Sequence, residues 1–516
     1  MESPDRKSPG VLDKVETWLR RNWPTVIVSM AVCGFLLRLY QAVTFYLNPD
    51  EAWHFLLASP SAGDGVMDLL RRSAKVPHPP LFIASLGMVA RFVRQEWLLR
   101  LFFVLSGSLF PVVLFLWLRK LAGLAAATSA FTLLLFSPPL IGLSAELRGY
   151  MPAFLLITAA AYVLEAVFER ASLRRLLVFH GLLYAAILME FCIVWIVASL
   201  GVYALLRLWQ TRAGLRIWLA WSVGQLGALA LYGFLYKVQT SQPTHQFEVN
   251  AAINGWLSTY FFHPGDSVVK FLVRSSAGLF EYVGGSLAVG FVVGVLWLIG
   301  IYKIWCSRRM LAALVVLPVF FGAAGAVLRL LPYGASRHSA YQSIFIAAVA
   351  GVAIAFLCRE RISLSLPAAL ILTVIANVFA VTPYITIPSE RHQLSDMRAA
   401  IDYLVSTPPA SKTVITDHGT GMMLTYYLGS NDPASVDIPP YASREIRGIR
   451  IIEAPGFSFE VPVDVQTAIE ETRKRYKLDS PLWVAVGGFV NRVETPIDRI
   501  KSFTDMLTLY PVPPAK

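Results

Sequence analysis

Charged residues are scarce in this chain: Asp, Glu, Lys and Arg make up 15% of its 516 residues, whereas 56% are hydrophobic. Cysteine is rarer still, with four copies, and residues 389–516 contain none. The sequence also contains no Asn-x-Ser/Thr sequon, no internal repeat, no low-complexity tract and no glycine-rich nucleotide-binding loop. These absences argue against an ordinary soluble protein and a disulfide framework. The missing sequon favours a bacterial envelope over an endoplasmic reticulum lumen.

What the chain does contain is apolar sequence, with a mean hydropathy of +0.57 and a net charge of +12 at pH 7. This composition indicates a polytopic membrane protein. Inner loops that face anionic lipid account for the positive charge, so nucleic acid is not expected as a partner. Residues 1–21 are polar and basic, and no small-residue cleavage pattern follows Leu47. The first apolar segment is therefore expected to remain as an anchor.

Each crossing of the hydrocarbon core needs about 20 apolar residues. Eleven segments are predicted to cross: 24–46, 97–118, 121–143, 151–168, 176–191, 192–206, 217–236, 278–304, 310–328, 341–357 and 363–384. Lys and Arg mark cytoplasmic ends. All basic clusters face inward only if the 12 apolar residues 79–90 do not cross, and that length is typical of an interfacial or re-entrant segment. A tight outer turn is expected at Glu190.

Residues 389–516 are more polar and predict a second domain on the outer face, after a transmembrane domain of residues 1–388. Apolar runs and helical spacing alternate along it, which favours a sheet with covering helices. We expect strands at Thr413–Thr416, 450–452 and 482–486, and helices at 397–405, 422–428 and Val465–Tyr476. The predicted fold class is a polytopic α-helical membrane protein with a C-terminal soluble α/β domain.

Polar residues that are unusual near hydrocarbon fall at the outer ends of the predicted spans. Acidic residues near a membrane are costly and usually mark a function. The predicted topology gathers on one face Asp50, Glu51, His78, Glu146, Arg148, Arg337 and His338, with His245, Glu248, His263 and Asp266 in a long loop at 238–274. This convergence is the main functional signal in the sequence.

Five of these residues lie in a set of four short motifs that occur in a known order. The motifs are Leu36-Leu-Arg-Leu-Tyr40 followed by Asp50-Glu51, then His78-Pro-Pro-Leu81, then Leu98-Leu-Arg-Leu101, then Ser144-Ala-Glu-Leu-Arg-Gly-Tyr150. Over residues 30–160 the chain resembles the GT-C membrane glycosyltransferases, in the branch of protein O-mannosyltransferases and lipid A aminoarabinose transferases. The resemblance implies a GT-C-like fold and transfer of a sugar from a polyprenyl phosphate carrier at the outer face. Met189-Glu190-Phe191 departs from the Thr-His-Tyr-like turn of many relatives, which leaves the acceptor open.

Such a reaction needs a base for the attacking hydroxyl and cations for the leaving phosphate. The resemblance implies that Asp50 is the general base. Glu51 would orient Asp50 or a substrate hydroxyl, and Glu146 is a second acid. The donor phosphate would be held by Arg148, by His78 and by Arg337, which lies in a segment similar to the Arg-Tyr segment of these enzymes. The acceptor would be a hydroxyl of a glycan, lipid or protein, attacked with inversion.

Each role has a plainer alternative. His78 is also explained as a cap of the interfacial helix, Arg148 as a neutraliser of Glu146, and Arg337 as a headgroup anchor. The stretch from His263 to Asp266, a possible substrate loop, is also explained as a plain turn.

No metal is expected to be obligatory, although Asp50, Glu51 and Glu146 offer oxygen ligands for Mg²⁺ or Mn²⁺. Two other classes of protein remain open. A transporter or lipid flippase would also have many helices, although repeats and mid-membrane polar groups are typical there. A noncatalytic envelope scaffold would use the C-terminal domain for binding.

Overall fold

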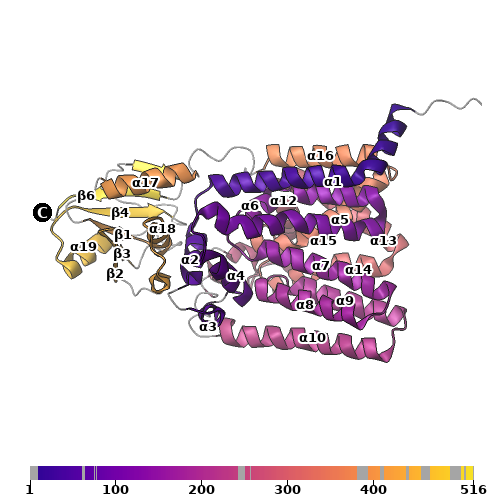
Figure 1. Cartoon of the computed structure of the whole chain (residues 1–516), viewed down its shortest axis with the longest axis horizontal. Helices are drawn as coiled ribbons and strands as arrows, with labels where there is room; N and C mark the ends of the chain where they lie inside the picture. Colours follow the sequence, from indigo (N-terminus) through magenta and orange to yellow (C-terminus); the bar gives the residue numbers. More distant parts are fainter. Residues whose placement is uncertain are drawn as a thin grey trace, which may run out of the picture.

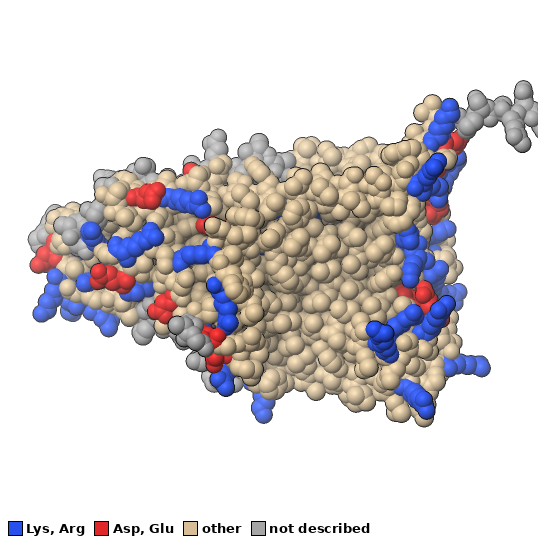
Figure 2. Space-filling view, in the orientation of Figure 1, with Lys and Arg blue, Asp and Glu red and all other residues tan. Residues whose placement is uncertain are grey.

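The chain folds into a long helical part and a smaller α/β part. The computed structural model describes residues 10–514 except 61–63, 75, 77, 242–249, 251, 256, 381–392, 407–411, 437–440, 455–464, 488–500 and 505–506. The helical part runs from α1 to α16, and the sheet part, from α17 to β6, lies at one of its ends (Figure 1). We call that end the sheet end. Lys and Arg side chains gather at the opposite end, the basic end (Figure 2).

Apolar helices of membrane-spanning length dominate the helical part. Its α-helices are α1 (Val11–Thr44), α2 (Pro49–Ala58), α3 (Val66–Ser73), α4 (Pro80–Ala90), α5 (Glu96–Leu135), α6 (Pro138–Ser144), α7 (Tyr150–Glu169), α8 (Leu173–Met189), α9 (Val194–Gln210), α10 (Leu215–Leu235), α12 (Val268–Gly284), α13 (Leu287–Ser307), α14 (Arg309–Val327), α15 (Ser343–Leu357) and α16 (Ile362–Val378). Shorter helices are η1 (Tyr236–Thr240), η2 (Ser258–Tyr260) and η3 (Arg337–Gln342). Among the described residues, seven helices are long and apolar enough to cross a membrane. The chain is an integral membrane protein.

Helix α5 contains two of the eleven expected crossings. Its backbone leaves the helical region at Gly123, where φ is 88°. The first arm begins at the sheet end, where Glu96 lies 3.5 Å from Arg398, and it reaches the basic end, where Arg119 covers the ring of Trp23. The second arm returns toward the sheet end and continues into α6. Segments 97–118 and 121–143 are therefore two arms joined by a sharp glycine turn, which a side chain would strain.

The prediction of a single crossing at 278–304 is wrong. Helix α12 ends at Gly284. The next residue, Gly285, adopts a left-handed conformation with φ of 75°, and α13 begins at Leu287. Ser286 caps α13 by accepting a hydrogen bond from the backbone N–H of Val289 at 3.5 Å. The left-handed glycine and the serine cap are ordinary stop and start signals. The two helices pack against each other as a hairpin, so close that a Cβ at Gly290 would lie 2.6 Å from the backbone nitrogen of Glu281.

Two expectations about short segments are confirmed. The segment at 79–90 forms the 11-residue helix α4, which at about 1.5 Å per residue is too short to cross. Helix α8 ends at Met189 and α9 begins at Val194, so Glu190 lies in a tight turn.

The sheet part is a six-stranded mixed sheet in the order β2-β3-β1-β4-β6-β5. Its strands are β1 (Thr413–Thr416), β2 (Ser443–Ile446), β3 (Ile449–Glu453), β4 (Leu482–Gly487), β5 (Lys501–Thr504) and β6 (Leu507–Val512), with helices α17 (Leu394–Ser406), α18 (His418–Tyr427), α19 (Val465–Tyr476) and the short helix η4 (Pro433–Val436). Strand β1 lies between β3 and β4 and is parallel to both. The strands predicted at the positions of β1, β3 and β4 are confirmed, and so is α19. The boundary predicted at residues 388 and 389 lies outside the described residues.

The sheet part is attached to the helical part along α18. A Cβ at Gly419 would lie 3.2 Å from Cβ of Pro49, and the hydroxyl of Tyr427 accepts a hydrogen bond from the backbone N–H of Leu47 at 2.7 Å. Just beyond Tyr427, the last residue of α18, the Arg94 guanidinium donates to the carbonyl oxygens of Gly429 at 2.9 Å and Ser430 at 3.0 Å. Both ends of α18 are therefore fixed to the membrane part, and its first turn lies on the first turn of α2.

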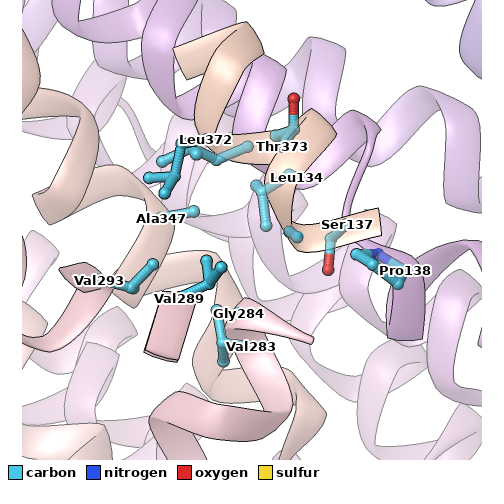
Figure 3. A pocket seen from close by; sticks show the side chains of 12 residues that line it. Leu134, Ser137, Pro138, Val283, Gly284, Val289, Val293, Ala347, Leu372 and Thr373 are labelled. Atoms are coloured by element: carbon cyan, nitrogen blue, oxygen red, sulfur yellow. The ribbon is translucent and has the colours of Figure 1, made fainter. Parts of the chain in front are cut away.

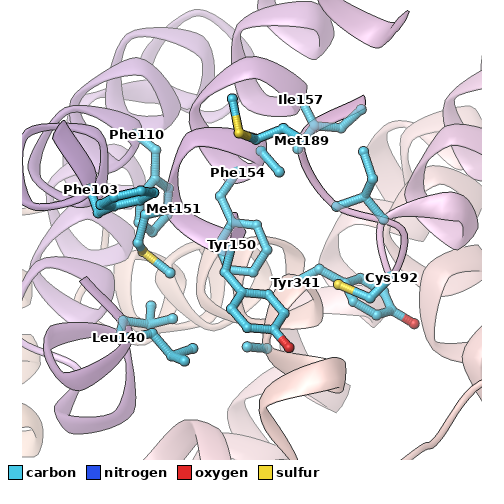
Figure 4. Close-up of a cluster of buried hydrophobic side chains, with 14 of the residues drawn as sticks. Phe103, Phe110, Leu140, Tyr150, Met151, Phe154, Ile157, Met189, Cys192 and Tyr341 are labelled. Carbon is cyan, nitrogen blue, oxygen red and sulfur yellow. The ribbon is translucent and has the colours of Figure 1, made fainter. Parts of the chain in front are cut away.

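Closely packed apolar side chains lie beneath the sheet end. Figure 4 shows a cluster in which Phe103 and Phe110 of α5 meet Met151 and Phe154 of α7, with Tyr150 beside them. A separate cavity, lined mostly by apolar side chains from α5, α12, α13, α15 and α16 (Figure 3), measures about 20 Å³. That volume holds no more than about one water molecule. This cavity is too small to be a substrate site.

Candidate active site

The sequence Asn48-Pro49-Asp50-Glu51 starts helix α2 at the sheet end. The Asn48 side chain accepts a hydrogen bond from the backbone N–H of Glu51 at 3.0 Å, and the Glu51 carboxylate accepts one from the backbone N–H of Asn48 at 3.1 Å. This reciprocal pair is a capping box, and proline is favoured at the first helical position. The local sequence thus fixes where α2 begins and places Asp50 in its first turn.

Glu51 is buried, with 1% of its surface exposed, and is engaged on both oxygens. The Arg100 guanidinium donates to Oε1 at 2.9 Å and to Oε2 at 2.7 Å. The backbone N–H of Leu147 also donates to Oε1, at 2.9 Å. Glu51 therefore joins α2 to α5 and to the turn between α6 and α7. This burial does not fit the expected contact with a substrate hydroxyl, but it fits the expected orientation of Asp50 through the first turn of α2.

The Asp50 carboxylate is the point where two arginines meet. Its Oδ2 accepts hydrogen bonds from Arg148, which follows α6, and from Arg337, which begins η3, the latter at 2.8 Å. Burial acts to raise the pKa of Asp50, but the charges of Arg148 and Arg337 outweigh it and hold that pKa below its ordinary value. Three segments far apart in the sequence thus supply one carboxylate and two guanidiniums.

His54 lies one helical turn after Asp50 and was not singled out in the sequence. Its Nε2 lies 3.4 Å from Nδ1 of His78 and 3.5 Å from Nη1 of Arg148. Burial, followed by the charges of Arg148 and His78, lowers the pKa of His54 far below its ordinary value. The residue is therefore neutral and packs between its two neighbours. Its four-residue spacing from Asp50 was a usable signal, since residues four apart share a helix face.

Glu146 lies in the same turn as Arg148. Burial raises the pKa of Glu146, and the charges of Arg337 and Arg148 offset this only in part. Its Oε2 is buried and has no hydrogen-bond partner among the described residues. The structure thus brings together two carboxyl groups whose environments shift their pKa values in opposite directions.

The turn that carries Glu146 and Arg148 is held by a neighbouring turn. Gly149 lies so close to the turn after α8 that a Cβ at this position would overlap the carbonyl oxygen of Met189. In that second turn, Oε1 of Glu190 accepts hydrogen bonds from the backbone N–H of Phe191 at 2.9 Å and of Cys192 at 3.4 Å. Only glycine fits this contact.

The predicted substrate loop does not join this group among the described residues. His263 and Asp266 form their own turn, in which the backbone N–H of Asp266 donates to the carbonyl of His263 at 3.1 Å and Nε2 of His263 lies 2.8 Å from the carbonyl of Ser258. His245 and Glu248 of the same predicted loop lie outside the described residues. His338, next to Arg337, contacts the hydroxyl of Tyr150 at 3.2 Å.

Comparison with solved structures identifies the fold. The crystal structure of ArnT from Cupriavidus metallidurans in the apo state aligns over 95% of this chain and 98% of that chain, with a TM-score of 0.54 and 13% sequence identity. The structure of the same protein bound to undecaprenyl phosphate aligns over the same shares, with a TM-score of 0.55 and 12% identity. The chain has the GT-C fold. No protein-family model and no curated protein sequence matches it.

In this GT-C fold, the residues predicted from the motifs occupy one place at the sheet end. Asp50, Arg148 and Arg337 are in direct contact, and the charge of His78 also helps to lower the pKa of Asp50. Their catalytic roles stay predictions. Two further residues of the cluster, Arg100 and His54, had no predicted role.

A divalent cation has no evident set of ligands here. The described part of the chain contains no group of three or more His, Cys, Asp or Glu side chains arranged to hold a metal ion. The carboxylates of Asp50 and Glu51 already bind arginines. Whether the reaction needs a metal stays a prediction.

Proposed function

We propose that this chain is a membrane glycosyltransferase that transfers a sugar from a polyprenyl phosphate carrier to a hydroxyl of a glycan, lipid or protein acceptor. The contact of Asp50 with Arg148 and Arg337 carries the proposal. It combines a carboxylate, which can accept a proton, with two guanidiniums, whose geometry suits phosphate oxygens. The GT-C fold, and a carrier lipid bound in one of the similar ArnT structures, support it.

The arginines have two successive partners in the proposed reaction. Without substrate, Arg148 and Arg337 bind Asp50 and lower its pKa. A donor phosphate competes for the same guanidiniums and draws them away from the carboxylate. Losing these contacts raises the pKa of Asp50 toward its ordinary value, which makes it a better base. Donor binding thus prepares the base for the acceptor.

The chemical step is a single displacement. The acceptor hydroxyl oxygen forms a bond to the anomeric carbon, and its proton passes to Asp50. The bond from that carbon to the phosphate oxygen breaks, and polyprenyl phosphate leaves with the electron pair. Arg148 and Arg337 stabilise the charge that develops on the phosphate. One displacement on one face inverts the anomeric configuration.

The other polar groups have supporting roles in this proposal. Glu146, whose pKa is raised, holds a proton more readily than Asp50 and is suited to hydrogen-bonding the sugar. His78 lies beside the phosphate site, and neutral His54 keeps His78 and Arg148 in position. Glu51 positions the first turn of α2 rather than touching substrate.

The membrane orientation follows from charge in the same proposal. The basic end faces the cytoplasm by the positive-inside rule, so the sheet end faces the periplasm of a bacterial inner membrane. The donor, the acceptor and the sheet part then meet on the outer face.

The test is release of polyprenyl phosphate from labelled polyprenyl-phosphate sugars by protein in nanodiscs. The wild type is compared with Asp50→Asn and with Asp68→Asn, a matched acid on α3 that pairs with exposed Arg71. We expect release by the wild type and by Asp68→Asn, and a loss of at least about a hundredfold in Asp50→Asn. Lipid movement by the wild type without cleavage of any donor would favour the flippase alternative, and equal turnover in both variants would remove Asp50 as the base.

A further inference from the structure

The sheet part presents the carboxyl ends of its parallel strands to the membrane part. The chain passes from β1 to β3 on one side and then to β4 on the other side. In sheets wound this way, ligands bind outside the carboxyl ends of the strands, where the strand order reverses. Thr416 and Glu453 end β1 and β3 side by side, and Ala485, two residues before the end of β4, lies on the other side of Thr416. Helix α18 starts directly after β1 and rests on α2, so this edge faces the candidate active site.

A histidine held by a carboxylate lies at this edge. Nδ1 of His418 lies 2.7 Å from Oε2 of Glu453, whose other oxygen accepts a hydrogen bond from Arg444. The Glu453 side chain is 8% exposed, whereas that of His418 is 55% exposed. None of the described residues forms a hydrogen bond with Nε2 of His418. The carboxylate fixes the ring and leaves that nitrogen for another molecule.

This histidine is close to Asp50 along the contact between the two parts. Gly419 follows His418 and packs on Pro49, which precedes Asp50, at 3.2 Å between their Cβ positions. Chain geometry then places the Cα atoms of His418 and Asp50 no more than about 14 Å apart. One acceptor molecule can span that distance, with its reactive hydroxyl at Asp50 and another polar group at His418.

We propose that His418, oriented by Glu453, binds the acceptor through Nε2, which contacts a hydroxyl or phosphate oxygen of the acceptor while another of its hydroxyls reacts at Asp50. This proposal rests on the proposed function. The neutral ring, with its Nδ1 proton toward Glu453, accepts a hydrogen bond from a hydroxyl, and the imidazolium donates one to a phosphate. A hydroxyl and a phosphate of the acceptor would both form a hydrogen bond with Nε2, and the experiment distinguishes between them.

The charges around the ring support a role in binding. Burial acts to lower the pKa of His418, but the hydrogen bond and the charge of Glu453 outweigh it and raise that pKa above its ordinary value, against the charge of Arg444. Asp417, which caps α18 by accepting a hydrogen bond from the backbone N–H of Thr420 at 2.9 Å, adds a further carboxyl group next to the ring. The ring is therefore charged over more of the neutral range than a free histidine.

The experiment separates acceptor binding from donor chemistry. A glycolipid extract of the bacterial envelope, before and after phosphatase treatment, serves as acceptor for wild type, His418→Ala, His418→Gln and Lys474→Ala, an exposed control on α19. Transfer to the extract and hydrolysis of the donor by water are measured side by side. We expect the acceptor KM to rise about tenfold or more in both His418 variants. The donor KM and the hydrolysis rate should stay at the wild-type values.

The outcomes distinguish the two oxygens and the two proposals. If the rise in acceptor KM of the His418 variants disappears after phosphatase treatment, the contact is with a phosphate. If the rise persists, the contact is with a hydroxyl. An unchanged acceptor KM, an equal fall in transfer and hydrolysis, or a wild type that uses water alone overturns the role of His418. Glu453→Gln is a second variant, expected to change the pH dependence of the acceptor KM without changing donor hydrolysis. A wild type that cleaves no donor overturns the proposed function instead.

Discussion

Replacing Glu51 by Gln tests the buried ion pair that holds the candidate site together. The substitution keeps the shape of the side chain but removes the charge that neutralises Arg100, and it turns one acceptor oxygen into a donor. That donor would face the Arg100 guanidinium together with either the N–H of Leu147, at the Oε1 position, or the N–H of Asn48, at the Oε2 position; all of these groups now bind the carboxylate at 2.7 to 3.1 Å. Breaking a buried ion pair by removing one partner costs about 3–5 kcal/mol. We expect the unfolding free energy of Glu51→Gln to fall by about that amount.

Thermal and denaturant unfolding of the purified protein in one detergent measure this loss. Asp68→Asn is the matched control, because it breaks an ion pair whose Arg71 side chain is 74% exposed, and exposed ion pairs contribute little to stability. Turnover of a polyprenyl-phosphate sugar should also fall in Glu51→Gln, since Leu147 adjoins Arg148. Equal stability of Glu51→Gln and Asp68→Asn would refute the view that this pair fixes the site.

Two further changes test other contacts of the site. Arg337→Gln removes one of the charges that hold the pKa of Asp50 down, so the acidic limb of the pH–rate profile should move to higher pH. The stabilisation from ionised Asp50, which is lost as pH falls through its folded-state pKa, should likewise be lost at higher pH; unshifted limbs in rate and melting profiles would contradict this. Gly149→Ala should lower the unfolding temperature because its Cβ overlaps the Met189 carbonyl, whereas Gly181→Ala, in open space on α8, should be neutral or slightly stabilising. Matching melting curves of these two glycine variants would argue against the close approach of the two turns.

Local sequence signals predicted much of the fold. The bounds of β1 and α19 agree with prediction, because a short buried strand and a charged amphipathic helix are visible in their own residues. The prediction of one continuous span at 278–304 was wrong because no change in hydropathy marks the end of the first helix. Hydropathy is continuous through Gly285, so it hides the stop and start signals that Gly285 and Ser286 provide.

The candidate site, like the fold, was predicted in part. The residues that meet at Asp50 lie in motifs that the sequence displays, so Arg148 and Arg337 were predicted to lie near it. The partner of Glu51 was not predicted, because Arg100 lies 49 positions away on another helix. Nothing in one sequence says which arginine meets which carboxylate. Contacts of this kind depend on packing between helices, and the structure supplied them.

The attachment of α18 at both ends has a consequence for how such proteins change over evolutionary time. Arg94 donates hydrogen bonds to carbonyl groups after the end of α18, and the hydroxyl of Tyr427 accepts one from the backbone N–H of Leu47, so each part completes hydrogen bonding of the other. A foreign domain joined at the same position would leave these groups without partners. Exchange of the C-terminal domain between such proteins would therefore require matching changes at Leu47, Pro49 and Arg94, and the two parts are expected to be inherited as one unit.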